Sequence, residues 1–157
     1  MILYSWIFFD YKLYAESLLQ IYFLVIQIIG WFWWLKGRGS DGKIIVLRLT
    51  SREAIAYAGT GAIIAIVLGW VMKTYTNASV PFFDSTVASL SVIAQFLLAK
   101  QRLENWIVWI ITDVLSIGIY IYKMLYPTAV LYTVFLGMAI GGLATWLAHI
   151  QDQRASA

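Results

Sequence analysis

One aspartate lies in the middle of a membrane-length apolar run. Its carboxylate could bind a cation or accept hydrogen bonds from a polar molecule. Asp113 interrupts the segment ENWIVWIITDVLSIGIYIYK at residues 104–123. A carboxylate at the centre of a bilayer costs about 3 kcal/mol on insertion scales, so it usually faces a partner or a water-filled cavity. We therefore predict that Asp113 belongs to a functional site.

Aromatic side chains share a helix face with this aspartate. Trp106, Trp109, Asp113 and Tyr120 follow one another at spacings of 3, 4 and 7 residues, and such spacings place residues on one side of a helix. The alternative is that the tryptophans anchor the helix at the interface or pack in the core. That alternative fits Trp106, near the end of the run, better than the deeper Trp109.

Polar side chains in neighbouring apolar runs are further candidates. Ser91 and Gln95 are four residues apart; such groups often form only hydrogen bonds between helices, worth about 0.6 kcal/mol. The amide of Gln95 could also donate and accept hydrogen bonds toward a ligand. Gln20 and Gln27 are seven apart and should face the bundle interior, because amides are costly in lipid.

Other polar and small residues have structural explanations. Asp84 follows VPFF at the start of a span and is expected to cap a helix N-terminus. Asn105, beside Glu104, is expected to form a cap or a surface pair. Gly137 and Gly141 form a small-xxx-small pair and Gly142 adds to it, which predicts close helix packing.

The sequence carries no catalytic or cofactor motif. It has no cysteine, so it can form no disulfide, thiolate metal site or thiol nucleophile. Its only histidine, His149, lies beyond the last apolar run, and there is no HExxH motif, no P-loop and no serine with a base. We expect no enzyme, no metal, no cofactor and no ATP-driven pump.

The composition is that of an integral membrane protein. Hydrophobic residues make up 62% of the 157 residues and charged residues only 12%, against roughly 25% charged in soluble domains. The partner implied is the lipid bilayer, and nothing points to nucleic acid. Apolar runs cover residues 1–9, 17–35, 54–72, 85–99 (extendable to Phe82), 105–122 and 124–148. Since about 20 helical residues cross a bilayer, an all-α helical bundle is expected.

Basic residues predict the orientation of this bundle. Numbering the runs in order places eight of the 11 Lys and Arg residues in the connections 36–53 and 100–104 and at the C-terminus. By the positive-inside rule, those segments and the C-terminus are predicted to be cytoplasmic.

The two ends of the chain are similar to each other. A shift of 112 residues gives 11 identities over positions 1–35, including Tyr14 on Tyr126, Gly30 on Gly142 and Trp34 on Trp146. Both copies run in the same direction, and parallel repeats of this kind are a transporter plan with the substrate near mid-depth.

The repeat predicts the domain organisation. Residues 1–35 form a partial first repeat, 36–53 a cytoplasmic loop, 54–72 a linker helix, 83–147 a second three-helix repeat and 148–157 a cytoplasmic tail. The intact design would be 3+1+3, and this chain is expected to lack the first span and a half.

Several segments together resemble the PnuC-type vitamin transporters. They are LLQIYFLVIQIIGWFWWLKG, SREA, DSTVASLSVIAQFLLAKQRLENWIVWIITDVLSIGIYIYK and the Gly-rich last span. The resemblance implies a 3+1+3 fold similar to SWEET sugar transporters. It also implies facilitated diffusion of nicotinamide riboside through the bacterial inner membrane, with trapping by a cytoplasmic nicotinamide riboside kinase.

Such a substrate, a flat charged heterocycle on a sugar, needs ring faces and hydrogen-bonding groups. The expected substrate-binding residues are Gln27, Ser91, Gln95, Trp106, Trp109, Asp113 and Tyr120. Two alternatives stay open at this point, a thiamine or riboflavin carrier of the same family and a truncated scaffold that does not transport. The sequence is compatible with a homo-oligomer and does not decide that question.

Overall fold

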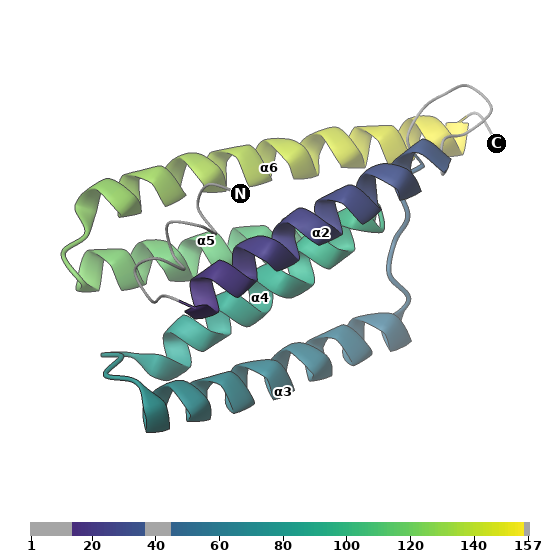
Figure 1. The fold of residues 1–157 in the computed structure, drawn as a ribbon. Helices are drawn as coiled ribbons and strands as arrows, with labels where there is room; N and C mark the ends of the chain where they lie inside the picture. Colours follow the sequence, from purple (N-terminus) through teal and green to yellow (C-terminus); the bar gives the residue numbers. More distant parts are fainter. Residues whose placement is uncertain (1–13, 37–44, 156–157) are drawn as a thin grey trace.

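The described chain is a bundle of long helices. The computed structural model describes residues 14–36 and 45–155, which form α2 (Tyr14–Lys36), α3 (Ser51–Tyr75), α4 (Pro81–Ala99), α5 (Glu104–Tyr122) and α6 (Tyr126–Ala155) (Figure 1). Helices α3 to α6 are long and apolar enough to cross a membrane, and α2 carries a shorter apolar stretch. The prediction of an all-α membrane protein is confirmed. The run 1–9 lies outside the described residues.

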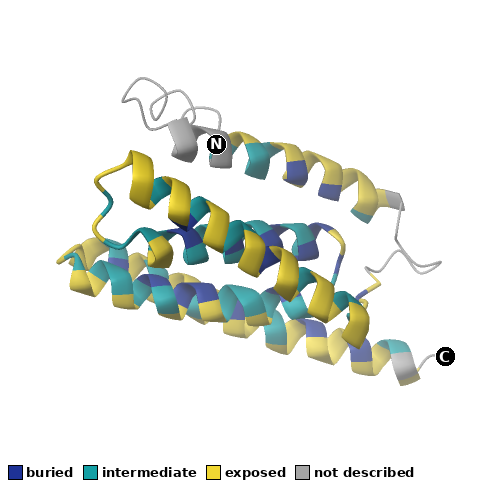
Figure 2. Ribbon diagram, turned by 90° about the horizontal axis from the view of Figure 1, so that it is seen from below, coloured by how far each residue is buried: buried dark blue, intermediate teal, exposed yellow. Residues whose placement is uncertain are grey.

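Helix α4 is at the centre of the packing. It contacts α2, α3 and α5, and α6 packs on α5. Figure 1 shows α2, α4 and α6 running in one direction and α3 and α5 in the other. The outward faces of the helices are largely exposed (Figure 2), and they carry side chains such as Ile55, Trp70 and Val130. Apolar side chains on the outside are expected where the surrounding solvent is lipid.

A glycine on α6 permits the closest approach of an aromatic ring to this helix. A Cβ built on Gly142 would lie 2.5–2.6 Å from three ring atoms of Trp106, whereas no described residue lies within 4 Å of such a Cβ on Gly137 or Gly141. The prediction of close packing is therefore confirmed at Gly142 and wrong for Gly137 and Gly141 among the described residues. Adjacent helix positions point about 100° apart, so the packing face passes through Gly142 and misses its neighbour.

An extended segment before α3, which we call the strap (residues 45–50), joins the turn between α4 and α5. The Leu47 amide donates to the Gln101 carbonyl at 3.0 Å, and the Leu103 amide donates to the Leu47 carbonyl at 2.9 Å. Val46 is buried in a cluster with Leu103, Trp146 and Ile150. The strap thus joins three parts of the chain that the basic residues predict to share one side of the membrane.

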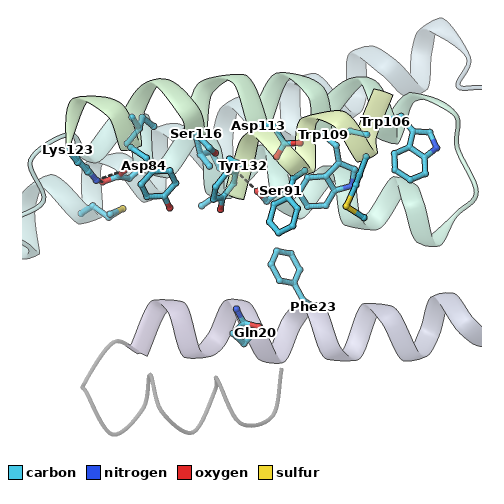
Figure 3. A pocket seen from close by; sticks show the side chains of 18 residues that line it. Gln20, Phe23, Asp84, Ser91, Trp106, Trp109, Asp113, Ser116, Lys123 and Tyr132 are labelled. Carbon is cyan, nitrogen blue, oxygen red and sulfur yellow. Dashed lines mark hydrogen bonds and ion pairs between the residues drawn. The ribbon is translucent and has the colours of Figure 1, made fainter. Parts of the chain in front are cut away.

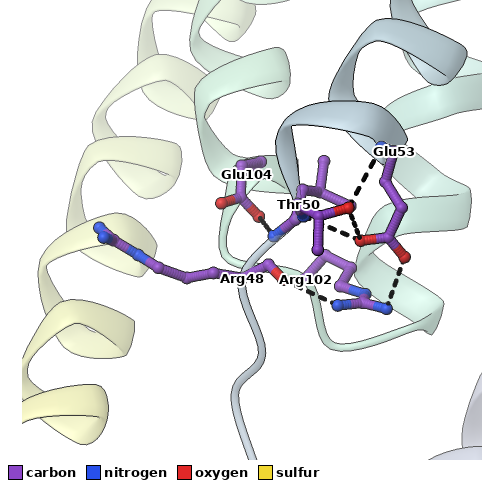
Figure 4. A network of polar contacts seen from close by, with 6 residues as sticks. Arg48, Thr50, Glu53, Arg102 and Glu104 are labelled. Carbon is purple, nitrogen blue, oxygen red and sulfur yellow. Dashed lines mark hydrogen bonds and ion pairs between the residues drawn. The ribbon is translucent and has the colours of Figure 1, made fainter.

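Polar contacts hold the strap to α3 and α5 (Figure 4). The Arg102 guanidinium donates to the Arg48 carbonyl at 2.8 Å and to the Glu53 carboxylate at 3.0 Å. Thr50 and Glu53 form a capping box, which satisfies orphan amides at the helix start. Glu104 accepts a hydrogen bond from the Leu49 amide. Because of this cap, α3 begins at Ser51, earlier than the predicted residue 54.

The two helices that belong to the predicted repeat correspond in register. Equivalent positions of the repeat are 112 residues apart in the sequence, and both copies fall within helices, α2 (Tyr14–Lys36) and α6 (Tyr126–Ala155). Trp34 and Trp146, also repeat equivalents, have ring centroids 6.2 Å apart. Equivalent residues that touch must lie near the axis relating the repeats. These observations support the repeat, while the 3+1+3 arrangement stays a prediction.

Two predictions about polar residues at helix starts are wrong. The N-cap of α4 is Val80, without a side-chain cap, and the helix starts at Pro81. Proline suits the first helical position because it has no amide hydrogen to satisfy, so the start precedes Asp84. Asn105 is fully buried and donates to the Arg102 carbonyl at 2.6 Å, so it is not a surface residue.

The last helix is longer than its apolar run. Helix α6 continues to Ala155, through most of the segment 148–157 that is predicted as a tail. Which side of the membrane this end occupies stays a prediction.

Candidate functional site

A cavity of about 650 Å³ opens between α2, α4, α5 and α6 (Figure 3). Its volume lies within the range of about 300–1,000 Å³ that is usual for small-molecule sites. The polar and aromatic residues that line it are Gln20, Phe23, Asp84, Ser91, Trp106, Trp109, Asp113, Ser116, Tyr120, Lys123, Tyr132 and Phe135.

One face of α5 supplies the middle of the cavity wall. Trp109, Asp113, Ser116 and Tyr120 all line the cavity, as their helical spacing predicts. The Asp113 side chain is buried, with an exposed fraction of 3%. No described residue forms a hydrogen bond or ion pair with it, so its carboxylate is available to a ligand or to water. Asp113 therefore lines a cavity, and its role in a functional site stays a prediction.

Trp106 closes one end of the cavity. Its ring packs edge-on against Trp146, with centroids 5.5 Å apart and planes at 88°, and it lies over Gly142. The packing role considered for Trp106 is therefore real, and the same ring also contributes to the cavity lining. The buried cluster that contains Val46 of the strap lies next to this end of the cavity, because Trp146 belongs to that cluster and also packs against Trp106.

An ion pair lies at the other end. The Lys123 ammonium nitrogen is 2.9 Å from both carboxylate oxygens of Asp84. Asp84 is in the first turn of α4 and Lys123 follows the last residue of α5, so each charge has the sign that its helix end favours. This pair explains Asp84 better than the predicted cap.

Five of the predicted site residues come together in this cavity. They are Ser91, Trp106, Trp109, Asp113 and Tyr120. Gln27 does not join them: it is exposed and lies in a shallow apolar groove on α2 with Leu24 and Trp31. A spacing of seven residues gives the same direction as Gln20 but a position about 10 Å farther along the axis, beyond the cavity.

Gln95 is also outside the cavity lining. It is buried on α4 with an exposed fraction of 8%, one turn beyond Ser91, which does line the cavity. Of the polar candidates on α2 and α4, Gln20 and Ser91 line the cavity, whereas Gln27 and Gln95 do not.

Several lining residues were not predicted. Ser116 lies three residues after Asp113 and four before Tyr120, so the spacing of the α5 face contains the signal for it. Tyr132 on α6 stacks on Tyr120, with centroids 5.1 Å apart; nothing in the pattern of α6 marks this tyrosine among its many apolar neighbours.

The repeat is visible in the lining itself. Gln20 on α2 and its repeat equivalent Tyr132 on α6 both line the cavity. Phe23 on α2 and its equivalent Phe135 on α6 do the same. The cavity therefore lies between the repeat-equivalent helices, where parallel-repeat transporters bind their substrates.

The chemistry of this arrangement is that of binding. A buried carboxylate surrounded by aromatic ring faces suits a flat cation, through charge attraction and cation–π contact. The described residues contain no cluster of His, Cys, Asp and Glu side chains suited to a metal ion. A ligand-sized cavity among apolar, membrane-length helices is the arrangement expected of a membrane transporter.

Comparison with known proteins gives the family. The family model of the nicotinamide mononucleotide transporters matches residues 1–148, so the chain belongs to this family. The nicotinamide riboside transporter PnuC of Escherichia coli is 24% identical over 180 residues, covering 99% of this chain and 75% of that protein. PnuC of Neisseria mucosa is 22% identical over 157 residues, covering 92% of this chain and 59% of that protein.

A solved structure shows the same fold. The crystal structure of the vitamin B3 transporter PnuC matches with a TM-score of 0.72 at 20% identity, covering 96% of this chain and 68% of that one. The resemblance to PnuC-type transporters is confirmed, and with it the expectation of a multi-pass membrane transporter.

Proposed function

We propose that this chain carries nicotinamide riboside across the bacterial inner membrane by facilitated diffusion, with phosphorylation by a cytoplasmic kinase trapping the product. The observation that carries the proposal is the unpaired Asp113 carboxylate among ring faces in a ligand-sized cavity. Nicotinamide riboside is a planar pyridinium cation joined to ribose. Its cationic ring matches the aromatic faces of the lining and the negative charge of this carboxylate, and its hydroxyls match the polar groups of the lining, the carboxylate included.

The charges in the cavity favour a nucleoside over a nucleotide. Lys123 is the only lysine or arginine among the lining residues, and it is already bound to Asp84. A phosphate would therefore enter a partly buried space without an unpaired cation among the described residues, and burying an unpaired charge is costly. Nicotinamide mononucleotide should bind more weakly than the riboside.

The residues also suit a passive mechanism. The sequence has no P-loop to bind ATP, and one neutralising carboxylate holds a cation less tightly than a cage of charges would. Uptake then depends on consumption of the substrate inside the cell, and the coupling to the kinase is metabolic and requires no contact between the two proteins.

Isothermal titration calorimetry on the purified, detergent-solubilised chain tests the substrate. Nicotinamide riboside, nicotinamide mononucleotide, thiamine and riboflavin are titrated in parallel. We expect the riboside to bind at least about tenfold more tightly than the others, a difference of about 1.4 kcal/mol. Preferential binding of thiamine or riboflavin would mean that this member of the family carries that vitamin instead of the riboside. Absence of binding by all four compounds would contradict the proposal.

A further inference from the structure

Ser116 has a buried hydroxyl group without a hydrogen-bond partner. Its exposed fraction is 1%, and no described residue bonds its Oγ. The residue lines the cavity. Buried polar groups in native proteins are nearly always hydrogen-bonded, so an orphan hydroxyl in a ligand cavity indicates that the ligand supplies its partner.

Neighbouring hydroxyls are bonded within their own helices, whereas Ser116 Oγ is one of four buried side-chain polar atoms of the described residues without a partner. Ser91, also in the lining, donates to the Val87 carbonyl at 2.9 Å, and Thr112 donates to the Val108 carbonyl at 2.8 Å. Both therefore use the common bond from a helical serine or threonine to the carbonyl four residues before it. Ser116 lacks that bond although it lies on the same helix as Thr112.

Asp113 lies beside this hydroxyl. The two residues are three positions apart on α5, about 4.5 Å along its axis, and both line the cavity (Figure 3). Asp113 likewise has no hydrogen-bond or ion-pair partner among the described residues. Helix α5 therefore presents a carboxylate and a hydroxyl close to each other. The ionised carboxylate only accepts hydrogen bonds, and the hydroxyl both donates and accepts them.

We propose that Asp113 and Ser116 together bind the vicinal diol of the substrate's ribose. The carboxylate accepts hydrogen bonds from the ribose hydroxyls, and Ser116 Oγ exchanges a hydrogen bond with one of them. This inference rests on the proposed function, because it assigns the sugar of that substrate to a specific pair of residues. It makes Ser116 a specificity residue that distinguishes ribosides from deoxyribosides.

The test combines deletion of the hydroxyl on the protein with deletion of a hydroxyl on the ligand. Calorimetry measures binding of nicotinamide riboside and of its 2′-deoxy and 3′-deoxy derivatives to the unaltered chain and to Ser116→Ala. We expect Ser116→Ala to weaken riboside binding roughly 3- to 10-fold, as for one hydrogen bond. For one of the deoxy derivatives, the same substitution should cause no further loss.

Two further variants serve as controls. Thr112→Val removes a hydroxyl of the same helix that is already bonded to the Val108 carbonyl and does not line the cavity, so it should change riboside affinity less than about twofold. Ser116→Thr keeps a hydroxyl and should restore discrimination between riboside and deoxyriboside. Size-exclusion profiles and thermal unfolding confirm that each variant is folded.

The outcomes separate this inference from the proposed function. Equal weakening of the riboside and of both deoxy derivatives by Ser116→Ala, or no weakening at all, overturns the diol assignment. So does riboside binding by the unaltered chain without discrimination against either deoxy derivative, and in these cases the proposed function stands. Absence of riboside binding by the unaltered chain overturns both.

Discussion

At the scale of single residues, the cavity contains one charge that the protein leaves unpaired. Asp113 has no described partner, whereas Lys123 and Asp84 neutralise each other. The spacing of α5 was sufficient to predict Asp113, Trp109 and Tyr120, because helical periodicity fixes which residues share a face. It was not sufficient for Gln27, since a shared direction on α2 does not determine where along the helix the cavity ends.

The ring of Trp109 is one turn from Asp113 in the cavity wall. If it stacks on the pyridinium ring, Trp109→Ala should weaken riboside binding by about 0.5–2 kcal/mol, the range of a cation–π contact, and Trp109→Phe should lose less. Calorimetry measures the effect. Trp70→Ala, on the exposed face of α3, is the matched control and should leave affinity unchanged; equal effects of the two alanine variants would exclude the stacking role.

At the scale of elements, the helices are positioned by a few close contacts that the sequence does not reveal. The small-xxx-small pattern of Gly137 and Gly141, with Gly142 beside it, identified three glycines, and of these the structure packs Gly142 against Trp106. Such a pattern shows that a helix can approach closely without showing which of its faces does so. The strap was likewise not predictable in detail, because its bonds join Leu47 to residues more than 50 positions away.

Two adjacent glycines of α6 test this packing. A methyl group at Gly142 would lie 2.5 Å from the rigid Trp106 ring, so Gly142→Ala should destabilise the protein by about 1–3 kcal/mol, as overpacking does. Gly141→Ala adds its methyl to open space and should be neutral or stabilising, by up to about 1 kcal/mol. Thermal unfolding in detergent measures both variants; equal shifts would show that this contact does not position Trp106.

At the scale of the whole molecule, two repeat-equivalent helices lie on either side of one cavity. Helices α2 and α6 contribute equivalent lining residues and touch through Trp34 and Trp146. The sequence predicted the repeat from identities at Tyr, Gly and Trp positions, which chance matches of Leu and Ile seldom reproduce. It could not predict the cavity wall from α6, because Tyr132 and Phe135 look like any other apolar surface of a span.

The orientation of the molecule also belongs to this scale. Arg48, Arg52, Lys100 and Arg102 lie at the strap end of the bundle or next to it, while Lys73 and Lys123 lie toward the opposite end. The positive-inside rule then predicts that the strap end lies in the cytoplasm. A reporter fused at the C-terminus should be active in the cytoplasm, and one inserted at residues 76–80 should be active outside. The reverse pattern would contradict this orientation.

The most direct test of the account is transport by the purified chain in proteoliposomes, without ATP and without an ion gradient. We expect labelled nicotinamide riboside to enter until its internal concentration equals the external one. Asp113→Asn should slow entry at low substrate by roughly 10- to 100-fold, as for loss of a hydrogen bond to a charged group. Riboside excluded from the vesicles, or entry unchanged by Asp113→Asn, would contradict the claim that this carboxylate selects a cationic nucleoside for passive transport.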